Sequence, residues 1–309
     1  MFLAAQLIGL AVINAYSPHV KQTINETTGV VENVTITPYL PYGMQPPEIK
    51  PEISVVSIIV ALLFATLLIF LLSRIKAVLF LRFWFFVVVL LALAITINAA
   101  FIPTKLFATQ FLALVVALPL AFYKVFERNL LVHNFTELLI YPGIAAIFVP
   151  ILNIWTALLL LIAISIYDMY AVWHTKFMQK MAKFQIQKVK VFAGFFVPYL
   201  TKTAKAKIAK LRKMKRVKLE KAGRKKGEPR ELKVKVGLAI LGGGDVAFPL
   251  IFAGVLFRAV GLISSLIVVL FATISLLLLF VFAKKGKFYP AMPFLTAGCI
   301  AGWLLGLLI

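Results

Sequence analysis

The sequence predicts an all-α polytopic membrane protein with about nine transmembrane helices. Hydrophobic residues fill 62% of the 309 positions, charged residues fill only 14%, and the mean hydropathy is +0.99. Soluble domains are about 45–50% apolar and about 25% charged, so a soluble fold is excluded. The apolar runs are continuous over about 18–22 residues, whereas the strands of a membrane β-barrel alternate apolar and polar residues. Helices are therefore expected.

Nine apolar stretches are long enough to cross a bilayer, given the rise of about 1.5 Å per residue in an α-helix. They are predicted at 2–17, 53–73, 78–98, 104–123, 137–153, 155–173, 237–257, 260–282 and 290–308. No lysine or arginine precedes the first stretch, so it lacks the basic start of a signal sequence and is kept as a span.

The loops predict the orientation of these spans. Residues 18–52 carry four glutamates against two lysines, whereas basic residues follow the second, fourth, sixth and eighth spans. The positive-inside rule therefore places the N-terminus in the cytoplasm and the C-terminus outside. The chain is expected to divide into a six-span part at 1–173, a basic cytoplasmic loop at 174–236 and a three-span part at 237–309.

The net charge of +22 lies mostly in this loop, where 21 lysines and arginines stand against three glutamates. Because the loop flanks membrane spans, its expected partner is anionic lipid and not nucleic acid. Cys299 is the sole cysteine, and the three histidines are far apart in the sequence. Neither a metal site nor a cofactor is expected.

The chain has only two aspartates, Asp168 and Asp245, and both fall within predicted spans. A charge inside a span costs at least about 2.5–3.5 kcal/mol and usually marks function. The two spans run antiparallel, so the carboxyls should reach similar depths from the cytoplasmic side. Two adjacent carboxyls in an apolar site share a proton. One can then activate a water against an amide carbon while the other protonates the leaving nitrogen.

Two other interpretations of the aspartates stay open. A proton- or cation-coupled transporter also uses intramembrane carboxylates, and each aspartate could simply hydrogen-bond to a neighbouring helix. Three glycines before Asp245 favour proteolysis, because Gly242, Gly243 and Gly244 have no Cβ atoms and would let an unwound substrate backbone approach.

Three short motifs occur in order: YD at Tyr167–Asp168, GGGD at Gly242–Asp245 and PAM at Pro290–Met292. The set resembles the YD, GxGD and PAL motifs of the presenilin/signal peptide peptidase family of intramembrane aspartyl proteases. The resemblance implies a presenilin-like fold, transmembrane-helix substrates and catalysis by Asp168 and Asp245. It also implies that Pro290, Ala291 and Met292 shape the site and position substrate. Met292 departs from the usual leucine, but the exchange conserves apolar volume.

The stretch ELKVKVG before the seventh span alternates apolar and basic residues, which is the period of a strand. Leu232, Val234 and Val236 would share one face and could pair with an unwound substrate by β-augmentation. The alternative interpretation is that this stretch is a solvent-exposed basic segment before the helix and pairs with no substrate. The chain is expected to act without obligatory accessory proteins, and a homo-oligomer is left open.

Overall fold

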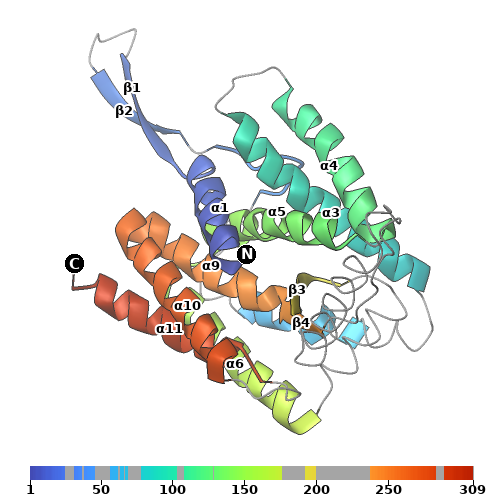
Figure 1. The fold of residues 1–309 in the computed structure, drawn as a ribbon. Helices are drawn as coiled ribbons and strands as arrows, with labels where there is room; N and C mark the ends of the chain where they lie inside the picture. Colours follow the sequence, from blue (N-terminus) through green and yellow to red (C-terminus); the bar gives the residue numbers. More distant parts are fainter. Residues whose placement is uncertain are drawn as a thin grey trace, which may run out of the picture. The chain divides into compact units, whose positions relative to one another are not determined.

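The computed structural model describes most of the chain. The described residues are 1–24, 31–36, 38–45, 56–61, 63–65, 67–68, 78–102, 108–127, 129–175, 192–199, 237–282 and 289–308. Two compact units divide the chain: Met1–Gly194 together with Gly242–Ile309, and Phe195–Leu241. The first unit contains the helices, and Figure 1 shows how they are arranged.

Helices dominate the described residues. They are α1 (Phe2–Ala15), α3 (Val78–Phe101), α4 (Thr109–Phe126), α5 (Leu130–Phe148), α6 (Ile154–Tyr170), α9 (Gly243–Ala259), α10 (Leu262–Phe282) and α11 (Met292–Gly306). A 3₁₀ turn (Val149–Ile151) extends α5, and a π turn (Ala171–Thr175) extends α6. A further apolar helical stretch covers Val56–Ala65.

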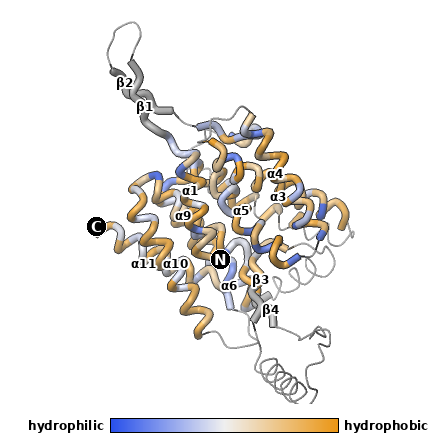
Figure 2. The backbone as a smooth tube through the Cα atoms, turned by 45° about the horizontal axis from the view of Figure 1, so that its top comes forward, coloured by the Kyte–Doolittle hydropathy of each residue, from blue (hydrophilic) through white to orange (hydrophobic). Residues whose placement is uncertain are grey.

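Five of these described helical stretches are long and apolar enough to cross a membrane: Val78–Phe101, Thr109–Phe126, Leu130–Ile151, Ile154–Trp173 and Leu262–Phe282. Figure 2 shows hydrophobic colouring along most of their length. The predicted all-α membrane fold is thus confirmed. The count of nine spans holds only approximately, because α1 and α11 are apolar but shorter than a full span.

Helix α9 occupies the centre of the first unit. It contacts α1, α5, α6, α10 and α11, and Leu250, Phe252 and Leu256 are fully buried. A helix that is apolar on all sides belongs in the interior of a large protein, surrounded by other helices. Helix α9 is therefore a rigid base for Asp245, which lies in its first turn.

Glycines allow neighbouring helices to touch through their backbones. A Cβ atom on Gly302 of α11 would lie 2.8 Å from the Cα of Val268 on α10. A Cβ on Gly143 of α5 would lie 2.8 Å from the carbonyl carbon of Ala92 on α3. Small residues at such contacts are typical of membrane helices, whose association depends on close packing.

The predicted span at 237–257 is wrong at its start. Residues Gly237–Gly242 form a strand, β4, which pairs with β3 (Gly194–Tyr199), and the helix begins only at Gly243. The run of glycines has poor helix propensity, and pairing with β3 satisfies the backbone groups that a helix would otherwise satisfy. Leu232, Val234 and Val236 lie outside the described residues.

A second pair of strands lies in the loop predicted to face outside. Strands β1 (His19–Ile24) and β2 (Val31–Ile36) form an antiparallel pair in which His19 lies opposite Ile36.

Candidate active site

Asp168 lies two residues before the end of α6 and is 6% exposed. Its Oδ2 accepts a hydrogen bond of 3.2 Å from the backbone N–H of Met292, and it also interacts with the backbone N–H of Ala291. Met292 is the first residue of α11, so its N–H has no partner within that helix. A carboxylate at a helix N-terminus is also favoured by the helix dipole. The PAM motif thus holds Asp168 through its backbone.

Asp245 is the third residue of α9. Its carboxyl folds back over Gly242, whose backbone N–H is its hydrogen-bonding partner. A Cβ atom on Gly242 would lie only 3.1 Å from Oδ2 of Asp245. The first glycine of the GxGD motif therefore provides both a donor and the space that the carboxyl occupies.

The structure brings the two aspartates together. Helices α6 and α9 pack against each other, and the two carboxyls are near enough for the charge of one to act on the other. Each carboxyl has a backbone donor from a different motif, Met292 for Asp168 and Gly242 for Asp245.

The remaining motif residues differ in their exposure. Pro290 and Met292 are buried, Ala291 is half-buried, and the Tyr167 side chain is 40% exposed. The side chains of the PAM motif therefore lie in the protein interior at the start of α11, whereas much of Tyr167 lies at its surface.

A polar pair beside Asp168 was not predicted from the sequence. Ser165 of α6 and Thr296 of α11 share a buried hydrogen bond of 2.6 Å. Ser165 lies one helical turn before Asp168, and Thr296 lies one turn after Met292, so the bond ties the same two helices together. The only sequence signal was the spacing of these two hydroxyls from the YD and PAM motifs.

Two further contacts hold the start of α9, and these were not predicted either. The N–H of Gly243 donates to the carbonyl of Ala193, at 3.3 Å. A Cβ atom on Gly243 would lie 3.1 Å from the hydroxyl of Tyr141, which belongs to α5. The glycine turn is therefore enclosed by α5 and by the chain at Ala193.

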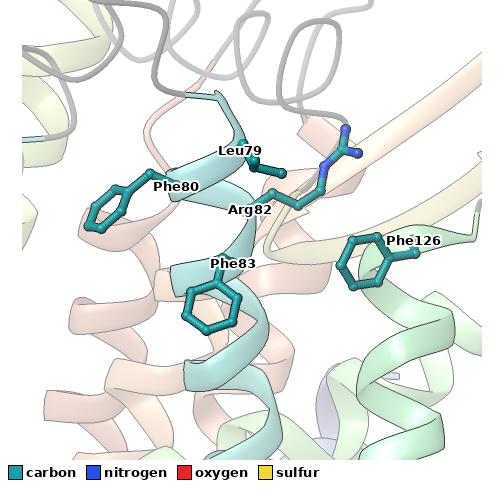
Figure 3. Close-up of a pocket in the computed structure, with 5 residues that line it drawn as sticks. All are labelled: Leu79, Phe80, Arg82, Phe83 and Phe126. Carbon is teal, nitrogen blue, oxygen red and sulfur yellow. The ribbon is translucent and has the colours of Figure 1, made fainter.

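A cavity of about 420 Å³ lies elsewhere, at the start of α3 and the end of α4. Its lining, shown in Figure 3, consists of Leu79, Phe80, Arg82, Phe83 and Phe126. None of the residues predicted for the site contributes to it, so it is not the candidate active site.

Residues 42–309 match the family model described as signal-peptide peptidase, presenilin aspartyl protease. The chain belongs to this family. Two solved structures of a presenilin family intramembrane aspartate protease, crystallised in space groups C222 and P2, have the same fold. The first gives a TM-score of 0.59 at 18% identity and the second 0.57 at 20%. Both comparisons cover 100% of this chain, and they cover 96% and 95% of the respective chains. No curated protein matches the chain.

The presenilin-family chain is therefore an intramembrane aspartyl protease and a multi-pass membrane protein. Enzymes of this class act on transmembrane substrates. The predicted family and fold class are confirmed.

Proposed function

We propose that Asp168 and Asp245 form the catalytic pair of this presenilin-family protease and hydrolyse peptide bonds within transmembrane helices of other proteins. The observation that carries the proposal is their arrangement. Asp168 and Asp245 lie on α6 and α9, which pack against each other, and Asp168 Oδ2 accepts a hydrogen bond of 3.2 Å from the Met292 N–H.

The proposed reaction uses one proton shared by the pair. The ionised carboxyl takes a proton from a water molecule, and the resulting hydroxide attacks the amide carbon. The protonated carboxyl hydrogen-bonds to the carbonyl oxygen, where negative charge develops. Collapse of the tetrahedral intermediate breaks the C–N bond as a carboxyl donates its proton to the nitrogen. The products are a new carboxyl group and a new amine, and the pair again shares one proton. The role of each aspartate at each step belongs to the coupled pair.

The sequence before α9 supports a route for the substrate backbone. Gly242 leaves the space that the Asp245 carboxyl occupies, and β4 leads directly into this turn. We propose that an unwound substrate pairs with the predicted strand that bears Leu232, Val234 and Val236. Replacing both valines by proline should abolish cleavage while the helices stay folded. Unchanged cleavage would remove strand pairing from the proposal.

The proposed topology places the N-terminus in the cytoplasm and the C-terminus outside, with the basic loop at 174–236 on anionic lipid. Catalytic geometry should follow topology, so substrates with their N-terminus outside should be preferred. Reconstituted enzyme that cleaves only the opposite orientation would contradict this inference.

The experiment that tests the aspartate pair is cleavage of a single-span peptide by purified protein in lipid vesicles. Asp168→Asn and Asp245→Asn keep the size of each side chain and remove its ability to ionise. Each should lower kcat by about 10³-fold or more, in line with the loss of other catalytic groups. Glu127→Gln is the matched control, because this exposed carboxyl follows α4 and should be dispensable.

Cleavage that survives either aspartate change would exclude the shared pair. Ion flux that depends on both aspartates, without peptide products from the wild type, would instead indicate a carboxylate-dependent transporter.

A further inference from the structure

A buried charged cluster lies between α4 and α5, away from the YD and PAM motifs. Lys124 of α4 forms an ion pair with Glu137 of α5, and both side chains are 1% exposed. The Lys124 Nζ lies 3.4 Å from Nδ1 of His133, and Nε2 of His133 lies 3.7 Å from Glu137. Burying such a pair costs desolvation energy that its attraction hardly repays, so stability alone is a poor reason for it.

His133 connects this cluster to the start of α9 through backbone carbonyls. His133 Nε2 lies 2.8 Å from the carbonyl oxygen of Gly194. Since a carbonyl can only accept, Nε2 carries the proton in this contact. The preceding carbonyl, of Ala193, accepts from the N–H of Gly243 at the start of α9.

Tyr141 provides a second connection between the cluster and the start of α9. This residue follows Glu137 by four positions, so the two side chains lie on one face of α5. Tyr141 is 2% exposed, and its hydroxyl lies near enough to Glu137 and Asp245 for their charges to act on it. The hydroxyl also lies against Gly243, where a Cβ atom would come within 3.1 Å.

The GxGD turn needs such support. Its three glycines restrict the backbone less than any other residues would, so the turn depends on its neighbours to keep its conformation. Reacting groups that are misplaced by about 1 Å can lose about 100-fold in rate. Tyrosine is suited to fixing this turn, because its rigid ring has few rotatable bonds and its hydroxyl packs against Gly243.

We propose that Tyr141, held in place by the Lys124–Glu137 pair, is a positioning residue that sets the Asp245 carboxyl for catalysis. The inference rests on the proposed catalytic role of Asp245. It assigns the buried charges of α4 and α5 to support of the active site.

Tyr141→Phe tests the proposal, because it removes one oxygen atom and keeps the ring. Tyr123→Phe is the matched control: this tyrosine is on α4, is 46% exposed and has its ring edge-on to Phe122. Tyr141→Phe should lower kcat by about 10- to 100-fold and change KM by less than about twofold. Tyr123→Phe should match the wild type in both constants.

Inhibitor binding separates positioning from general loss of structure. The probes are a peptide with a hydroxyl-bearing isostere of the tetrahedral intermediate at the scissile bond, and the same peptide with a plain methylene isostere. Tyr141→Phe should weaken the first probe about as much as it lowers kcat, and it should leave the second unchanged. Equal weakening of both probes, or wild-type kcat, would overturn the proposal.

The double variant Lys124→Met/Glu137→Gln tests the support behind Tyr141. It removes both charges together, so neither is left unpaired in the interior. Its kcat should fall as in Tyr141→Phe, and adding Tyr141→Phe should lower it little further, because the three groups act as one unit. Full additivity would contradict the coupling. If the double variant does not fold, the single tyrosine variant and the two probes still decide. Failure of the underlying catalytic assignment would look different, since Asp245→Asn would then remain active.

Discussion

Gly242→Ala is a sharp test of the geometry at Asp245. The backbone at Gly242 has φ −63° and ψ 149°, which alanine adopts without strain. The variant also keeps the N–H that holds the Asp245 carboxyl. The added Cβ would lie 3.1 Å from Oδ2, whereas ordinary contact begins at 3.4 Å. The carboxyl must therefore move by about 0.3 Å, and if about 1 Å costs about 100-fold, this shift should cost about fourfold in kcat.

Initial rates at saturating peptide, with enzyme in vesicles, would resolve this change. Gly242→Val adds two more methyl groups and should be at least about tenfold slower than Gly242→Ala, because the carboxyl must move further. Gly306→Ala is the control, since its Cβ would meet Ser264 at 3.4 Å, in ordinary contact at the far end of α11. Wild-type rates for Gly242→Ala and Gly242→Val, in protein with an unchanged melting temperature, would refute the close approach between this glycine and the carboxyl.

Three further outcomes follow from contacts described above. Met292→Leu should keep kcat within about twofold, because the donor to Asp168 is a backbone N–H and the side-chain volume is conserved. A larger loss of kcat in the cleavage assay would mean that the Met292 thioether itself contributes to catalysis. Glu137→Gln alone should lower the free energy of unfolding by about 3–5 kcal/mol, because it leaves Lys124 buried without a counter-charge. Denaturation in detergent measures this change, and the double neutral variant should recover most of it. Gly302→Val should cost about 1–3 kcal/mol by overpacking α11 against α10, and a melting curve like that of the wild type would contradict the close contact.

Much of the fold could be predicted, and the two aspartates could be singled out as the proposed catalytic pair, because both are conspicuous in the sequence. A long apolar run can cross a membrane only as a helix or as part of a closed barrel. A carboxylate inside such a run is costly to insert and usually belongs to a functional site. The start of α9 could not be placed, because β4 forms by pairing with β3, about forty residues earlier, and single-sequence periodicity does not reveal the partner.

The supporting residues were harder to predict for a related reason. Lys124 stands at the end of an apolar run, where hydropathy places it in a cytoplasmic loop, yet the structure buries it. Its partner Glu137 comes from the next helix, and Tyr141 is an ordinary aromatic residue until α9 packs beside it. The contacts of such residues arise only in the tertiary structure, so the sequence alone does not single them out. The strand with Leu232, Val234 and Val236 stays a prediction.

Helices α10 and α6 contact α11 in different ways. Against α10 the contact is backbone to backbone through Gly302 and other glycines, so these two helices should move as one body. Against α6 the polar ties are the Ser165–Thr296 bond and the Met292 donor to Asp168. If the enzyme opens beside α11 to admit a substrate helix, the α6 side should part first. Asp168 would then lose its Met292 donor whenever α6 and α11 are apart. Substrate entry and hydrolysis would then occur one after the other. The two aspartates would regain the geometry for hydrolysis only after α6 and α11 had come together again beside the bound substrate.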